Sequence, residues 1–160
     1  MSEKQFSVNA TATYEKVCKA IDNIGLPYSK FDNDLALASS VYGEDMLIDF
    51  IIAVDDETQL VKALSRLPFT VNEEKRFDMA IAVCAVNNRL SDGCFDYDIA
   101  SGDIIFRLTS CFKDSRLDVN VFDYMFYMTI RTVDHYNIKL YNFSEGNMEL
   151  AEFIRDISNK

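Results

Sequence analysis

The segment from Gly93 to Thr109 constrains the fold most, because its pattern is that of a β-hairpin. Two runs of alternating apolar residues flank Ser101-Gly102, a pair typical of a two-residue turn. With this turn, three residues of each strand share one apolar face, namely Phe95, Tyr97 and Ile99 opposite Leu108, Phe106 and Ile104. The same register places Asp96 opposite Arg107 on the other face. An apolar face of this kind must be covered, so the sequence predicts an α+β domain.

Two further β-rich runs precede the hairpin, Leu35–Ala38 and Met46–Val54, with the turn-forming Gly43-Glu44-Asp45 between them. Apolar residues dominate both alternating faces of the second run, which predicts a central strand covered on much of both sides. The segment from Glu57 to Leu67 is ambiguous. The spacing of its leucines leans slightly towards a helix, and a third strand is the alternative.

Helical periodicity predicts four helices, from about Thr11 or Thr13 to Ile24, Glu73 to Leu90, Val119 to Tyr136 and Met148 to Ile157. Asn72 and Asp118 are the expected caps of the second and third. The second helix is expected to bury a wide stripe against the sheet, consisting of Phe77, Ala80, Ile81 and Cys84 with the neighbouring Met79, Val83 and Val86. No interdomain linker or internal repeat is visible. We therefore expect a flexible N-terminus over residues 1–10 and a single domain over residues 11–158.

The third predicted helix is the candidate binding surface. Its polar stripe is narrow, and its aromatic and methionine content exceeds what one contact with a sheet requires. Packing against the last helix and an exposed interface both remain open. If the surplus faces a partner, the candidate partner-binding residues are Tyr124, Phe126, Tyr127 and Ile130.

No catalytic, cofactor-binding or metal-ligating residues are predicted. His135 is the only histidine, which excludes multi-histidine metal sites. The four cysteines lie far apart with no CxxC pair, so reduced and mostly buried thiols are expected. In the predicted hairpin register Cys94 and Cys111 are diagonal neighbours, which argues against a disulfide. A hydrolase that uses Cys84, Cys94 or Cys111 with His135 is a remote alternative.

Charge and hydropathy exclude several kinds of partner. The formal net charge is -10, and basic residues form no cluster. Nucleic acids and anionic membranes are bound mainly through such clusters, so neither is expected as a partner. The sequence from Met1 to Phe6 has no apolar core of a signal peptide, and we expect a cytoplasmic protein.

Several short motifs resemble the YbjN family, described as bacterial sensory transduction regulators. The most specific block runs from Asp92 to Arg107 and contains Asp92-Gly93-Cys94-Phe95-Asp96-Tyr97-Asp98-Ile99 and Phe106-Arg107. The supporting motifs are Leu67-Pro68-Phe69, Glu74-Lys75-Arg76, Ala80-Ile81-Ala82-Val83-Cys84 and Thr132-Val133-Asp134-His135-Tyr136-Asn137. The resemblance as a whole covers roughly Leu26 to Ile154. Asn87-Asn88 and Cys111 depart from the family pattern.

The YbjN family is similar in fold to the small acidic chaperones of type III secretion. This resemblance implies an antiparallel sheet of about five strands with helices packed against it, in the order α-β-β-β-α-β-β-α with a short C-terminal helix. It makes the segment from Glu57 to Leu67 a strand. It transfers no catalytic residue, because the family has none assigned.

The expected function is therefore a non-enzymatic regulatory or chaperone-like domain that binds a protein or peptide, or a second copy of the chain. The alternative is a small-molecule-sensing domain in which the surplus aromatic and methionine side chains line an apolar cavity. Fold alone does not distinguish the two.

Overall fold

A computed structural model describes residues 5–158. Within this range six strands form one antiparallel sheet, in the order β1-β2-β3-β4-β6-β5. The strands are β1 (Ser29–Phe31), β2 (Ala36–Tyr42), β3 (Leu47–Asp55), β4 (Leu60–Thr70), β5 (Cys94–Asp98) and β6 (Asp103–Cys111). The helices are α1 (Val8–Ile24), α2 (Arg76–Asn87), α3 (Val119–Ser144) and α4 (Leu150–Ser158), with short 3-10 turns η1 (Asp32–Asp34) and η2 (Glu73–Lys75). The predicted α+β class is confirmed, and β1 adds a strand to the expected five.

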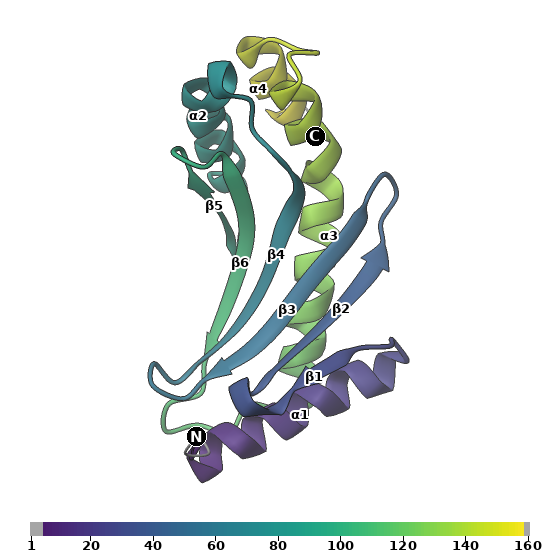
Figure 1. The fold of residues 1–160 in the computed structure, drawn as a ribbon, viewed down its shortest axis with the longest axis vertical. Helices are drawn as coiled ribbons and strands as arrows, with labels where there is room; N and C mark the ends of the chain where they lie inside the picture. The colour runs from purple at the N-terminus through teal and green to yellow at the C-terminus, as the bar shows by residue number, and fades with distance from the viewer. Residues whose placement is uncertain (1–4, 159–160) are drawn as a thin grey trace.

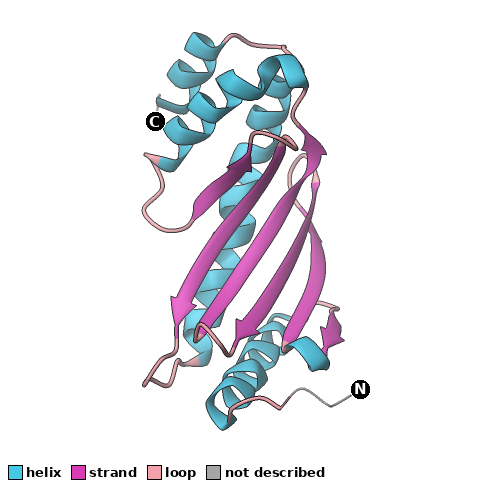
Figure 2. Ribbon diagram, turned by 60° about the vertical axis from the view of Figure 1, so that its left-hand side comes forward, coloured by secondary structure: helices cyan, strands magenta, loops and turns pink. Residues whose placement is uncertain are grey.

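The helices leave one broad face of the sheet open. The long helix α3 runs behind the sheet and contacts β3, β4 and β6, while α1 crosses its lower end and also contacts β3 (Figure 1). At the other end α2 packs beside β5, and α4 packs against α2 and α3. In Figure 2 the strands lie in front of α3 with their other face uncovered. The core therefore lies on one side of the sheet.

The burial of β3 shows the difference between the two faces. Ile48, Phe50, Ile52 and Val54 are buried, whereas Leu47 and Ile51, on the other face, are 40% and 46% exposed. The strand is central, as predicted, but the expected cover on both sides is wrong. The reason is that the helices pack on one face, so the second apolar row of β3 meets solvent.

The ambiguous segment from Glu57 to Leu67 forms most of strand β4, which confirms the strand implied by the family resemblance. The slight preference for a helix that its leucine spacing indicated is wrong. Val61, Ala63, Ser65 and Leu67 alternate into the core, and β4 pairs with both β3 and β6. The Ser65 hydroxyl donates to the carbonyl oxygen of Asp49 at 2.7 Å, which satisfies this buried polar group. The hydrogen-bonded pairing of β4 with a strand on each side outweighs the weak local preference of this segment for a helix.

The β5–β6 hairpin forms with a different register from the predicted one. Phe95 pairs with Phe106 and Tyr97 with Ile104, so the strands are shifted by two residues and the loop has four residues, 99–102. The Asp98 carboxylate accepts the backbone N–H of Ala100 at 2.9 Å, which stabilises this longer turn. A shift of two residues keeps every side chain on its predicted face, because the strand period is two.

Several helix ends differ from the predictions. Helix α1 begins at Val8, because the Ser7 side chain caps it by accepting from the N–H of Ala10 at 3.1 Å. Asp118 caps α3 as predicted, but α3 continues beyond Tyr136 to Ser144. Asn72 does not cap α2 and instead donates to the carbonyl oxygen of Ser144 at 3.2 Å. Helix α2 begins after η2 and ends before Leu90, and α4 begins two residues after Met148.

Helix α2 buries Met79, Val83 and Val86 of the stripe expected to face the core, but Phe77, Ile81 and Cys84 of that stripe face away from it. Met79, Ala82, Val83 and Val86 are buried. Phe77 and Ile81 are 79% and 51% exposed, and Cys84 is also exposed. Both sides of this helix are apolar, so the period of 3.6 residues was consistent with either orientation, and the predicted burial of Phe77, Ile81 and Cys84 is wrong.

Replacing Gly93 with alanine is expected to lower the free energy of unfolding by about 1–3 kcal/mol. Gly93 has a φ of 73°, and an added Cβ would lie 2.5 Å from the Phe106 ring. Gly146 is the matched control, since its φ is 75° but the nearest atom to an added Cβ is 3.7 Å away. Urea unfolding of both variants separates backbone strain from steric overlap. Equal losses would show that the ring moves aside without cost.

Candidate functional site

The residues predicted to bind a partner on α3 do not form one surface. Tyr124 and Tyr127 are 47% and 60% exposed, Ile130 is half-buried, and Phe126 is buried with its ring 5.1 Å from that of Phe50. The Tyr124 hydroxyl donates to the Asp92 carboxylate at 3.0 Å, and this bond raises the pKa of Tyr124. Phe126 therefore belongs to the contact between helix and sheet. The partner-binding role of the two exposed tyrosines remains a prediction.

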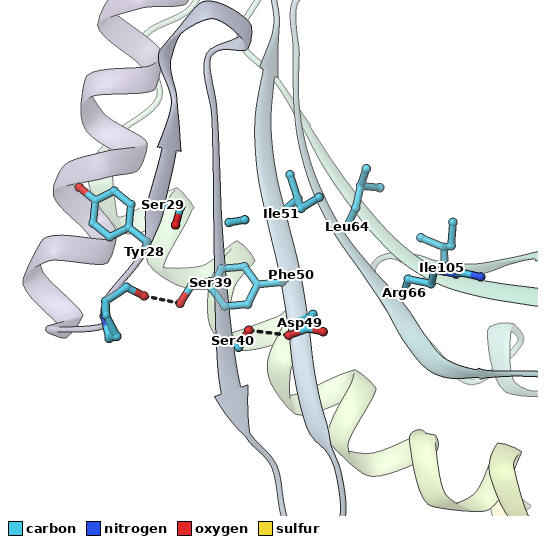
Figure 3. A pocket seen from close by; sticks show the side chains of 12 residues that line it. Tyr28, Ser29, Ser39, Ser40, Asp49, Phe50, Ile51, Leu64, Arg66 and Ile105 are labelled. Carbon is cyan, nitrogen blue, oxygen red and sulfur yellow. Dashed lines mark hydrogen bonds between the residues drawn. The ribbon is translucent and has the colours of Figure 1, made fainter.

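A groove of about 790 Å³ lies on the open face of the sheet (Figure 3). Its floor contains a row of side chains that are direct cross-strand neighbours, in which Ala38 pairs with Ile51 and Ile51 pairs with Leu64. Ile105 continues the apolar surface on β6, and Pro27 and Tyr28 form the rim beside β1. The groove thus crosses the strands.

Sequence reasoning missed this groove because it treated the row containing Leu47 and Ile51 as a second buried face. Asp49 lies in the same row, on the open face between these two residues. A charged residue in the middle of an apolar strand indicates a solvent-facing row, because a buried carboxylate would need a partner. Asp49 was therefore the residue from which the sequence could have predicted that this face of β3 is open to solvent.

The rim of the groove is held by polar contacts with β2 and α1. The Ser39 hydroxyl donates to the carbonyl oxygen of Pro27 at 2.6 Å. The Tyr28 hydroxyl donates to the Asp22 carboxylate on α1 at 2.9 Å. Burial, together with this hydrogen bond, raises the pKa of Tyr28 to about 12. These contacts explain how the three residues of β1 stay attached to the sheet edge.

The three basic residues on the open face of β4 and β6 each form an ion pair with an acidic residue. Lys62 pairs with Asp55 at 2.5 Å, Arg66 with Asp103 at 2.5 Å, and Arg107 with Asp96 at 2.6 Å. Hydrogen bonds from these bases are the main reason that the pKa values of Asp55, Asp96 and Asp103 lie below the usual range for a carboxyl group. Arg107 and Asp96 are diagonal neighbours rather than the direct pair predicted.

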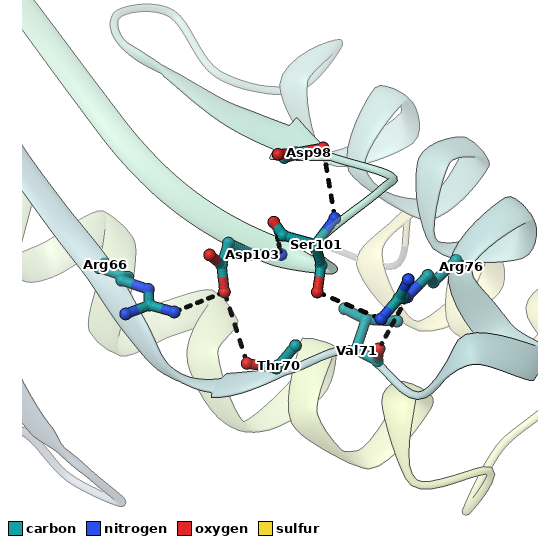
Figure 4. A network of polar contacts seen from close by, with 7 residues as sticks. All are labelled: Arg66, Thr70, Val71, Arg76, Asp98, Ser101 and Asp103. Carbon is teal, nitrogen blue, oxygen red and sulfur yellow. Dashed lines mark hydrogen bonds and ion pairs between the residues drawn. The ribbon is translucent and has the colours of Figure 1, made fainter.

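Further contacts fix the β5–β6 turn at the end of this face (Figure 4). Asp103 accepts from Arg66 and also from the Thr70 hydroxyl at 3.4 Å. The Arg76 guanidinium, at the start of α2, donates to the carbonyl oxygens of Ala100 and Ser101 at 2.5 and 3.2 Å. The turn is therefore attached to β4 and α2, which explains why it adopts the longer loop.

The groups considered for nucleophilic chemistry lie in separate places. Cys94 and Cys111 are on the strands that form the open face, whereas His135 is on α3 behind the sheet. Burial and the neighbouring Asp96 raise the pKa of the Cys94 thiol, which opposes formation of a thiolate. Cys84 is exposed on α2, and Cys18 is buried. All four thiols are free.

Residues 5–158 contain neither a metal-binding cluster nor a membrane-spanning helix. No group of three or more histidine, cysteine, aspartate or glutamate side chains in this range is arranged to hold a metal ion. None of the helices described here is long and apolar enough to cross a bilayer.

The fold is similar to those of several solved structures, although no protein-family model and no curated protein matches the sequence. YbjN from E. coli superimposes with a TM-score of 0.59 at 11% identity, covering 83% of this chain and 92% of that one. A chain of the ExsC–ExsE complex gives 0.60 at 12% identity, covering 84% and 97%. The ExoT–SpcS complex from Pseudomonas aeruginosa gives 0.50 at 11% identity, covering 81% and 98%. The chain thus has the fold shared by YbjN and the type III secretion chaperones, as the sequence resemblance implied.

Proposed function

We propose that this chain is a non-enzymatic, regulatory or chaperone-like domain that holds a segment of another polypeptide on the open face of its sheet. The observation that carries the proposal is the row of cross-strand apolar neighbours on the open face at the centre of the sheet, in which Ile51 is exposed and Ala38 and Leu64 are half-buried. Grouped apolar side chains of this kind on a protein surface commonly mark a binding site. Two solved structures of similar fold are complexes of two proteins, ExsC–ExsE and ExoT–SpcS, which supports a protein partner here.

The shape of the groove suits an extended chain. Neighbouring strands lie about 4.8 Å apart, so the apolar side chains across β2, β3 and β4 form an evenly spaced row. A segment laid over this row can place apolar side chains between those of Ile51 and Leu64. Beside the row, Arg66 pairs with Asp103 and Arg107 pairs with Asp96, so the flanks of the row are polar. A hydrophobic centre with a polar rim is typical of protein interfaces.

A small-molecule ligand is the second candidate, because the groove volume of about 790 Å³ falls in the range of small-ligand sites. The open, strand-crossing form of the groove favours the polypeptide, since small ligands are usually held in pockets that bury most of their surface. A second copy of this chain is a further occupant that the experiment below detects.

The test compares two double variants that each remove two apolar side chains from the surface, of which only Leu64 is half-buried. Ile51→Ser with Leu64→Ser alters the groove, and Phe77→Ser with Ile81→Ser alters α2 as the matched control. Each purified protein is crosslinked in a lysate of the source organism, and captured proteins are quantified by mass spectrometry. We expect a protein captured by the wild type and the α2 variant to fall at least about tenfold with the groove variant.

Capture of the same proteins by both double variants would contradict a role for the open face. A wild type that captures nothing would contradict the proposal as a whole. If the captured protein is this chain itself, sedimentation of the purified wild type would show a dimer, and the proposed occupant would be wrong.

A further inference from the structure

We infer that the segment held on the open face carries a basic side chain between apolar ones, and that this basic group pairs with Asp49. The inference rests on the proposed function, since it names the chemistry of the polypeptide in the groove. Among the carboxylates on the open face, Asp55, Asp96 and Asp103 form ion pairs and Asp49 forms none with the described residues.

Asp49 is the carboxylate lining the groove, and among the described residues it forms no ion pair, since Arg66, which lines the same groove, pairs with Asp103. The basic side chains on this face, Lys62, Arg66 and Arg107, pair with Asp55, Asp103 and Asp96. Within residues 5–158 no basic side chain forms an ion pair with Asp49. An incoming cation is therefore attracted to Asp49 without having to displace an existing partner.

The hydrogen bonding of Asp49 orients it for such a cation. The Ser40 hydroxyl, directly across the strand pair, donates to Oδ1 of Asp49 at 2.5 Å (Figure 3). This bond fixes the side chain over the open face and leaves Oδ2 without a hydrogen bond among the described residues. A carboxylate held by one neutral donor can accept a further charge-assisted hydrogen bond from an ammonium or guanidinium group.

The position of Asp49 also specifies the neighbouring side chains of the ligand. Asp49 and Ile51 lie two residues apart on the same face of β3, which corresponds to about 7 Å. The aliphatic stem of a lysine or arginine can pack on Ile51 while its charged head reaches the carboxylate. Apolar residues on either side in the ligand then cover Ala38 and Leu64.

The charge of the whole chain acts in the same direction. The formal net charge of -10 attracts a cationic segment at long range and repels an acidic one. This general attraction depends on ionic strength and does not select a position. The experiment must therefore separate the local effect of Asp49 from the overall charge.

The probes are three fluorescein-labelled nine-residue peptides in which leucine and serine alternate, with arginine, glutamine or glutamate in place of the central leucine. Their affinities for the full chain are measured by fluorescence anisotropy at low ionic strength. For the wild type we expect the arginine peptide to bind about tenfold more tightly than the glutamate peptide, with the glutamine peptide in between. In Asp49→Asn this ratio is expected to fall to about threefold or less.

Glu57→Gln is the matched control, because Glu57 is exposed in the β3–β4 loop and does not line the groove, and its loss changes the net charge equally. It is expected to keep the ratio of the wild type. Equal ratios in Asp49→Asn and Glu57→Gln, or no preference for arginine in the wild type, would overturn the inference.

The inference and the proposed function can fail separately. If all three peptides bind equally and the Ile51→Ser, Leu64→Ser variant loses them all, the face binds polypeptides but Asp49 selects nothing. If none of the peptides binds, the inference is wrong, and capture from the lysate decides the proposed function independently.

Discussion

Replacing Ile52 with alanine is expected to lower the free energy of unfolding by about 2–5 kcal/mol, whereas the same change at Ile51 should lower it by less than about 1 kcal/mol. The two residues are neighbours on β3 with the same side chain, but Ile52 is 1% exposed and Ile51 is 46% exposed. Truncating Ile52 leaves a cavity between the sheet and its helices. Truncating Ile51 removes side-chain atoms that already contact water.

Urea unfolding followed by far-ultraviolet circular dichroism measures both values. The Ile51 variant also controls for the change in β-propensity, because it introduces alanine into the same strand. A large loss at Ile51 would show that the open face is covered in solution, by a second copy of the chain. Repeating the titration over a range of protein concentrations would test that explanation, because the stability of a dimer depends on concentration.

Replacing Met79 with alanine is likewise expected to cost about 2–5 kcal/mol, while Phe77→Ala should change stability by no more than about 0.5 kcal/mol. Met79 is fully buried, and Phe77, two residues earlier on α2, is 79% exposed. Truncating the larger side chain, that of Phe77, is therefore expected to change the free energy of unfolding less than truncating Met79. Both variants introduce alanine, whose favourable helix propensity cannot explain a loss in one of them.

The pair tests the orientation of α2, which the sequence alone left undetermined. The reverse result, with a large loss at Phe77 and little at Met79, would place Phe77 in the core and Met79 outside it, whereas the sequence predicted that both are buried. Thermal unfolding in the calorimeter gives an independent measure of the same difference.

The candidate site was only partly predictable. The sequence predicted a binding surface on α3, and the structure leaves Tyr124 and Tyr127 exposed on this helix but buries Phe126 in the core. The groove on the open face was missed, because Tyr28 and Ser29 lie at a strand that was not predicted and Leu64 and Arg66 lie in the segment whose spacing leaned towards a helix. Which face of a strand is covered depends on where distant helices pack, and alternation along the strand does not contain this information.

The alternation of side chains by itself determined the strands β3, β5 and β6 and the face on which each residue of the hairpin lies. Local chemistry also determined the start of α3, since Asp118 accepts from the N–H of Asn120. These features depend on residues close together in the chain. The shifted pairing of the hairpin is held by Asp98 within the turn and also by contacts that Arg76 and Arg66 make from outside it.

Only the tertiary structure decided the strand at β4, the orientation of α2 and the open face of the sheet. In each of these segments the residues are apolar enough for two arrangements, so the local preference between them is small. The choice then follows from which arrangement buries more surface against the rest of the molecule. The same choice leaves Ile51 exposed and Leu64 half-buried on the open face beside Asp49, and so it creates the groove on which the proposed function rests.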